Sequence, residues 1–184
     1  MATTFVEIAN RAITYLGGDP ITSLSDDTKE GRSCNRLFEQ TRDQLLRDHP
    51  WNFAIKRASL AANAIAPEYE YTNAFDFPDG TLRIIEVNTT EDWAVEGRQI
   101  VSDASAPLQI VYIERVTDPN LFDAKFIEAF SLRLAADIAY DITASQTVAA
   151  TAEQKYSALL QEARLVDAQE SLSASEQSWL TARS

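Results

Sequence analysis

The chain has 184 residues, of which 45% are hydrophobic, and a formal net charge of -12 at pH 7. This length suits one domain, or one domain that carries an insertion. The charge disfavours a nucleic-acid-binding protein, because affinity for phosphates comes mainly from clustered Lys and Arg. One cysteine and one histidine leave no material for an internal disulfide or a His/Cys zinc site. We therefore predict no metal and no other cofactor.

The sequence contains no membrane signal. No apolar run approaches the roughly 20 residues that cross a bilayer, and the N-terminus lacks the charged-then-apolar pattern of a signal peptide. We expect a soluble protein that is made in the cytoplasm and does not contact a membrane. An acidic surface suits a conduit through which DNA slides without sticking, although most acidic proteins are acidic merely for solubility.

Two amphipathic helices are predicted before residue 50. Thr4 and Glu7 have the spacing of a capping box, and Gly17 ends the helix that this box begins. A second helix is expected from about Thr28 to His49, with one apolar face. That face consists of Cys34, Leu37, Phe38, Thr41, Leu45 and Leu46.

A mixed-charge set occupies the other faces of the second predicted helix. Its members are Arg32, Arg36, Glu39, Arg42 and Asp43. Exposed ion pairs are individually worth only about 0 to 1 kcal/mol, but each weak contact is repeated in a symmetric oligomer. The set is therefore either a solvated surface or a candidate interface between subunits.

A helix-to-strand corner is predicted at Pro50, which Trp51 and Phe53 follow closely. Proline disfavours helical backbone at the preceding residue and cannot donate to the helical ladder, so the chain should leave as an extended segment. Each fully buried aromatic ring contributes on the order of 2 to 3 kcal/mol. Pro50, Trp51 and Phe53 are candidate structural anchors between the helices and the next region, and His49 is expected to cap or pack.

Between residues 51 and 116 the apolar period shortens toward two, which predicts strands. Turn sequences such as Asp79-Gly80 and Glu96-Gly97 separate them. Short strands joined by such turns favour an antiparallel meander or a small open barrel. The best single strand is 110–113, whereas the alanines of 58–67 suit a helix and a loop equally.

Helical spacing returns after residue 117. A third helix should start at Asp118 or Asp123 and run to about Thr143, and a fourth should extend from there to about Leu172. The polar tail, 173–184, is expected to be flexible. Trp179 and Leu180 within it either dock on a partner or pack within the chain.

The predicted fold class is α+β, in the form of a mainly α-helical antiparallel bundle of four helices with an inserted small antiparallel β region. Residues 1–50 together with 117–172 would form the bundle. Residues 51–116 would form the β-rich insertion lobe.

Acidic residues near Trp93 suggest a glycan hydrolase as an alternative. Glu86, Glu91, Asp92 and Glu96 flank a ring on which a sugar could stack. A catalytic pair needs a defined separation across a cleft, whereas carboxylates on turns and strand edges are usually solvated. We predict no catalytic residue and no enzyme activity.

Five segments stand in order along the chain: IANRAITYLG (8–17), RDQLLRDHPWNF (42–53), AFDFPDGTLR (74–83), WAVEGR (93–98) and YIERVTD (112–118). In this order they resemble the tail tubular protein A family, the head-to-tail adaptor (connector) proteins of tailed bacteriophages. The resemblance extends from about Thr4 to about Glu170.

The resemblance implies a structural virion protein that forms a ring of about twelve copies between the portal protein and the tail nozzle or tube. DNA would pass through the ring as cargo during ejection. The free chain would be a monomer, made in the host cytoplasm from a phage or prophage gene, that orders on the portal. A host-side scaffold or regulatory helical protein stands as a second alternative.

Overall fold

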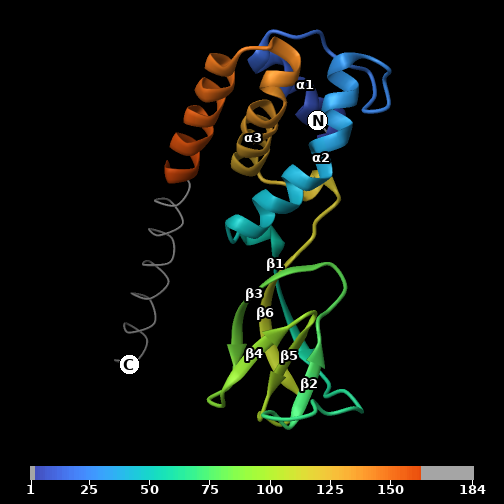
Figure 1. Cartoon of the computed structure of the whole chain (residues 1–184), viewed down its shortest axis with the longest axis vertical. Coiled ribbons are helices and arrows are strands. Elements are labelled where there is room, and N and C mark those ends of the chain that lie inside the picture. Colours follow the sequence, from blue (N-terminus) through green and yellow to red (C-terminus); the bar gives the residue numbers. More distant parts are fainter. Residues whose placement is uncertain (1–2, 163–184) are drawn as a thin grey trace, which may run out of the picture. The chain divides into compact units, whose positions relative to one another are not determined.

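The computed structural model describes residues 3–162, which divide into two compact units. One, called here the helical unit, holds the described residues up to Arg42 and those from Phe122 onward; the other, the β unit, is Asp43–Leu121 (Figure 1). No helix within 3–162 is both long enough and apolar enough to span a membrane.

The helical unit contains α1 (Phe5–Leu16), most of α2 (Lys29–Asp48), α3 (Ala124–Thr143) and a further helix over 146–162. The predicted capping box is confirmed: Glu7 N donates to Thr4 Oγ1 over 3.2 Å, and Thr4 N donates to Glu7 Oε2 over 3.0 Å. Gly17 ends α1 with φ 72°, a conformation that glycine adopts without strain.

Phenylalanine rings link three of these helices. The ring of Phe38 in α2 lies 5.2 Å from that of Phe5 in α1 and 4.7 Å from that of Phe130 in α3. Phe126 continues the series, 5.8 Å from Phe130. Each such pair adds about 0.5 to 1.5 kcal/mol beyond the apolar area it buries. The apolar faces of α1, α2 and α3 therefore share one core.

Helix 146–162 is attached along α3. Arg133 of α3 donates to Glu153 over 3.1 Å, and its guanidinium lies 5.6 Å from the centre of the Tyr156 ring. Lys125 pairs with Glu162 at 3.0 Å. Asp123, one of the two predicted starts, caps α3 by accepting from Phe126 N over 2.6 Å.

The β unit contains two three-stranded antiparallel sheets. The first has the order β1 (Ile55–Leu60), β6 (Leu108–Glu114), β3 (Thr81–Asn88), and the second has the order β2 (Asn73–Asp76), β5 (Gln99–Ser102), β4 (Trp93–Glu96). Both sheets contribute to one core, which consists of Leu60, Phe75, Val87, Ile100, Ala104, Leu108, Ile110 and Tyr112. The two inner faces therefore pack on each other as a small sandwich.

The predicted fold class is wrong because it underestimates the strand content. Strand residues make up 21% of the structure, in two sheets rather than one small insertion. The physical reason is that three strands are only four residues long and lie between turns, so their period is hard to distinguish from loop sequence. The two sheets bury a core of their own, and the protein is not a four-helix bundle with a minor insertion.

The corner after α2 also differs from the prediction. α2 does end before Pro50, at Asp48, but the chain then forms a short 3-10 helix over Asn52–Ala54 before β1 begins. Ala54 N donates to Trp51 O over 2.9 Å, which closes this turn. Proline forbids continuation of the preceding helix but does not require the following residues to be extended.

Candidate functional site

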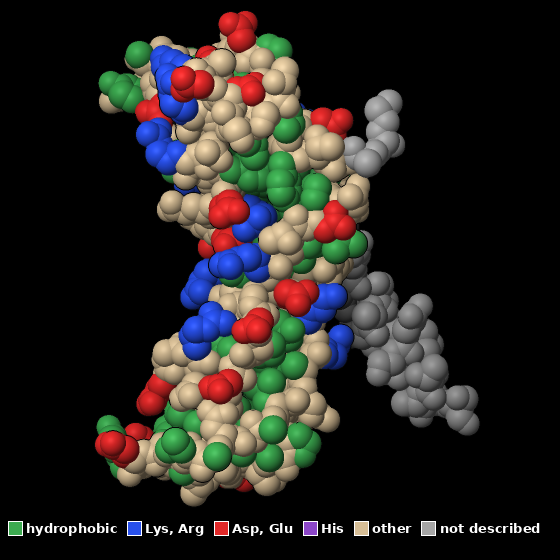
Figure 2. All heavy atoms as spheres, turned by 90° about the vertical axis from the view of Figure 1, so that its right-hand side faces the viewer, with side chains coloured by type: hydrophobic (Ala, Val, Ile, Leu, Met, Phe, Trp, Pro, Cys, Tyr) green, Lys and Arg blue, Asp and Glu red, His purple; other side chains and the backbone are tan. Residues whose placement is uncertain are grey.

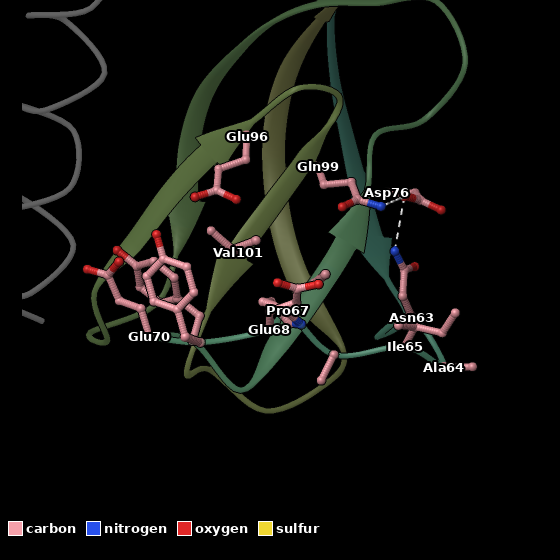
Figure 3. Close-up of a pocket in the computed structure, with 14 residues that line it drawn as sticks. Asn63, Ala64, Ile65, Pro67, Glu68, Glu70, Asp76, Glu96, Gln99 and Val101 are labelled. Atoms are coloured by element: carbon pink, nitrogen blue, oxygen red, sulfur yellow. Dashed lines mark hydrogen bonds between the residues drawn. The ribbon is translucent and has the colours of Figure 1, made fainter.

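An open groove of about 740 Å³ lies on the outer face of the β2-β5-β4 sheet (Figure 3). Its floor is formed by alternate side chains of the three strands: Ala74, Asp76, Glu96, Gln99 and Val101. Residues 63–71, from the loop between β1 and β2, form the opposing wall. Phe75 and Ile100 of the same strands belong to the core, so the floor faces away from the core.

Asp76 is fixed at one side of this groove by two amides. Asn63 Nδ2 donates to Asp76 Oδ1 over 3.0 Å, and Gln99 Nε2 donates to the same oxygen over 2.8 Å (Figure 3). These two bonds, that from Asn63 first, lower the pKa of Asp76. The carboxyl group is therefore ionised near neutral pH and has no proton to give as a general acid.

Acidic side chains gather around Tyr71, on the other side of the groove, where Figure 3 labels Glu70. Burial raises the pKa of the Tyr71 hydroxyl, and the negative charges of Glu70, Asp92, Glu96 and Asp103 raise it further. All four carboxylates belong to exposed residues. This side of the groove is negatively charged and favours a cationic partner.

Large apolar side chains are exposed close to these carboxylates. Ile65 and Tyr69 on the loop are 83% and 80% exposed, and Trp93 and Val95 on β4 are about half-exposed. On the face shown in Figure 2, hydrophobic and acidic side chains are visible among other groups at the end of the β unit drawn lowest, and no Lys or Arg is visible there. Exposed apolar groups rimmed by polar ones are typical of protein contact surfaces.

The carboxylates of the glycan-hydrolase hypothesis are divided between surfaces. Glu86 pairs with Val111 and lies on the outer face of the β1-β6-β3 sheet, whereas Glu96 lies on the outer face of the other sheet. The core of the sandwich separates them. Glu91 lines a different hollow from Glu96. Asp92 and Glu96 both act on Tyr71, but Glu86 and Glu91 line other hollows, so the four candidates do not meet across one cleft.

Two charged residues predicted as interface on α2 have partners in the helical unit. Arg36 pairs with Asp141 of α3, and Arg32 pairs with Asp27 just before α2. Both pairs are exposed, so each contributes about 0 to 1 kcal/mol. Glu39 is exposed on the same helix.

The division between the two units falls between Arg42 and Asp43 of α2. Arg42 is only 4% exposed, so its predicted place on a wet face is wrong. The reason is helical spacing: Arg42 lies one turn after Phe38 and one turn before Leu46, which are both buried. Asp43 accepts from Arg115 Nε over 2.7 Å within the β unit.

The predicted anchors lie together at the start of the β unit. Trp51 is buried, its Nε1 donates to Leu45 O over 3.2 Å, and the ring of His49 meets it edge-on at 4.6 Å. The Phe53 ring is 6.5 Å from that of Trp51, and Pro50 and Phe53 are half-buried. His49 is thus a packing residue, as predicted, and Trp51 closes the end of α2.

Trp179 and Leu180, and the whole predicted tail over 173–184, lie outside the described residues.

Neither the cysteine nor any acidic cluster forms a metal or nucleophile site in the described part of the chain. Cys34 is fully buried, and burial, with a contribution from Glu30, raises its pKa to about 11. No group of three or more His, Cys, Asp or Glu within 3–162 is arranged to hold a metal ion.

The groove and its loop are what sequence reasoning missed. Residues 58–67 gave no clear period, and the exposure of Ile65 and Tyr69 cannot be read from residue type. One signal was present: the run Pro67-Glu68-Tyr69-Glu70-Tyr71 alternates acidic and aromatic residues beside a proline, a pattern suited to an exposed loop with contact function.

Comparison with known families and with curated proteins found no matching family model and no matching protein.

Proposed function

We propose that this chain is a structural head-to-tail adaptor of a tailed bacteriophage or prophage. Copies of it form a ring between the portal protein and the tail nozzle or tube, and DNA passes through the ring as cargo. The chain acts by contact with copies of itself and with its neighbours in the virion and makes no covalent change. The number of copies, about twelve, is carried over from the resemblance to the tail tubular protein A family.

One observation carries the proposal: the groove loop of the β unit exposes Ile65 and Tyr69 beside the carboxylates of Glu68 and Glu70. Tyrosine is enriched among the hot spots of protein interfaces, and exposed apolar groups rimmed by polar ones are typical of contact surfaces. In an adaptor, this surface of the β unit contacts the tail component or the neighbouring subunit. The helical unit forms the body of the ring and meets the portal.

The net charge of -12 is consistent with the same role. DNA carries one negative charge per about 1.7 Å of its axis, so an acidic channel wall repels it and holds no segment in place. Passage during ejection requires this lack of adhesion.

The adaptor function is tested by sedimentation of portal rings in a density gradient. Portal rings mixed with the chain should carry it to their own position in the gradient, whereas the chain alone stays near the top. Tail nozzle protein should then join the complex of portal and adaptor but not the portal alone. A chain that never moves with the portal contradicts the proposal.

Variants assign the nozzle contact to the β unit. The double substitution Ile65→Ser and Tyr69→Ser should weaken nozzle binding at least about tenfold and leave portal binding unchanged. Truncation of a hot-spot residue costs about 2 kcal/mol or more of binding free energy. Leu121→Ser is the matched control, since Leu121 is also apolar and exposed in the β unit. An equal loss of nozzle binding in Leu121→Ser would contradict the assignment of the nozzle contact to Ile65 and Tyr69.

A further inference from the structure

The two sheets of the β unit have four edge strands, β1, β3, β2 and β4. Of these, β4 has the least protected edge. Unpaired edges present free backbone N–H and C=O groups and are templates for pairing with another chain. Proteins protect such edges by bulges, by Lys on the strand, or by covering segments.

Three edges carry a protecting device. β3 has register irregularities between Thr81 and Arg83 and between Ile84 and Glu86. β1 carries Lys56 and Arg57, both exposed. β2 is covered by the groove loop, from which Asn63 N donates to Ala74 O over 2.8 Å.

β4 has none of these devices. Its four residues, Trp93 to Glu96, contain no proline, lysine or arginine, and its pairing with β5 is regular from end to end. Within the described residues, the backbone of β4 forms hydrogen bonds only with β5. Just before β4, Asp92 O accepts from Ser102 Oγ. Trp93 and Val95 are about half-exposed on one face of this edge.

The edge is also held in position. Ser102 Oγ donates to Asp92 O over 2.8 Å and accepts from Ala104 N over 3.1 Å, so the start of β4 is tied to the end of β5. Ser102, Ile100 and Val101 of β5 are buried. A template that is already ordered loses little conformational entropy when a partner binds.

Charge decides what binds there. Glu91, Asp92 and Glu96 flank or lie on β4, and Glu96 shares the groove face with Glu70. The nearest basic residue in sequence, Arg98, lies over the ring of Phe77 at 6.0 Å. The edge is therefore apolar on the face of Trp93 and Val95 and acidic on the face of Glu96.

We propose that β4 is a docking site for an extended segment of a partner protein in which apolar and basic residues alternate. The segment adds to the β2-β5-β4 sheet as a fourth strand. Its apolar side chains lie beside Trp93 and Val95, and its basic side chains lie on the opposite face, beside Glu96, because successive side chains of a strand point to opposite faces.

A second copy of this chain is a poorer occupant than a basic partner. The chain carries a net charge of -12, so two copies repel one another, whereas a segment with Lys or Arg is attracted. Four residues of β4 supply only a few backbone hydrogen bonds, and side-chain complementarity must provide the selection. The site concerns this edge alone and does not depend on portal or nozzle binding.

The test uses the full chain and a short synthetic peptide that alternates lysine with valine, labelled for fluorescence anisotropy. A peptide that alternates glutamate with valine is the control ligand. The lysine peptide should bind, and the glutamate peptide should bind at least about tenfold more weakly. Glu96→Lys should weaken binding of the lysine peptide by about tenfold, whereas Glu86→Lys, the same exposed charge change on the other sheet, should leave it unchanged.

Amide hydrogen exchange separates strand addition from simple charge attraction. Bound lysine peptide should slow exchange at outward-facing amides within 93–96, and Val95→Lys, which places a protecting lysine on the edge, should abolish that effect. Equal binding of both peptides, equal loss in Glu86→Lys, or protection at another edge would overturn the proposal. Protection of 93–96 without peptide that grows with protein concentration would assign the edge to a second copy instead.

Discussion

Gly31 occupies a position in the first turn of α2 where a side chain has no room. A Cβ atom there would lie 2.3 Å from the carbonyl oxygen of Asp26. That carbonyl is not free to move, because the Asp26 side chain accepts from Thr22 N over 2.7 Å and from Ser23 N over 3.2 Å. The turn before α2 therefore leaves room only for glycine at position 31.

We expect Gly31→Ala to destabilise the chain by about 1 to 3 kcal/mol, the range for an overpacked site, although alanine is the better helix former. The free energy of unfolding is measured by urea denaturation followed by circular dichroism. Gln40→Ala, at an exposed position of the same helix, is the control and should be neutral or stabilising. A midpoint for Gly31→Ala at or above that of the unchanged chain would show that the turn relaxes freely.

The Asp76 carboxyl, which lines the groove, should make the stability of the chain depend on pH. Its pKa is lowered by hydrogen bonds from Asn63 and then Gln99, so the folded value is below the unfolded one. The stabilisation it contributes is therefore present above the unfolded pKa, about 4, and is lost as the pH falls through the folded pKa.

We expect the Asp76 carboxyl carbon to titrate below its usual range in an NMR experiment, and Asn63→Ala to move that pKa upward. The thermal midpoint of the unchanged chain should fall more steeply below pH 4 than that of Asp76→Asn. Glu86→Gln serves as the control carboxylate. An Asp76 pKa in the ordinary range would mean that the two amides do not hold it in solution.

At the scale of elements, helix 146–162 depends on a few contacts with α3. Tyr156, Ala152 and Leu159 are its buried side chains, and Arg133 joins it through Glu153 and the Tyr156 ring. Glu153 is about half-exposed, and Arg133 also pairs with Asp137 of α3 at 2.9 Å, so we expect the Arg133–Glu153 pair to add little. Apolar burial is therefore what keeps this helix on α3.

Tyr156→Ala should release helix 146–162 while α3 stays folded, since a short helix without its apolar contacts is marginal in water. Hydrogen exchange of peptides covering 146–162 is expected to speed up by about tenfold or more, and exchange within α3 much less. Gln154→Ala, an exposed change on the same helix, controls for propensity. Unchanged exchange in Tyr156→Ala would place the attachment elsewhere.

The elements differ in how far their sequences predict them. α1 and α3 have a long 3.6-residue period with capping residues at Thr4 and Asp123; α1 begins where expected, and α3 begins at the second of its two predicted starts. β2, β4 and β5 are four residues long, and their pairing is set by contacts between distant segments, which no local period encodes. Sheet content was therefore underestimated, and so was the burial of Arg42.

The groove could not be predicted for a related reason. It exists because the loop over 63–71 folds back across the β2-β5-β4 sheet, fixed by the bonds of Asn63 to Asp76 and Ala74. An asparagine in an alanine-rich loop does not indicate such a partner. Trp93, by contrast, was singled out by its type, but as a sugar platform beside carboxylates rather than as part of an open strand edge.

At the scale of the whole molecule, the two units suit different roles in the proposed adaptor. The helical unit has aromatic contacts among its helices, which suits the body of a ring. The β unit has its own core and presents exposed apolar side chains beside carboxylates, which suits contact with a further component.

Electron microscopy of portal rings, with and without the purified chain, tests this account most directly. An adaptor should add a layer of density beneath the portal ring, with the rotational symmetry of repeated copies and an open channel through its centre. Portal rings that look the same with and without the chain would contradict it.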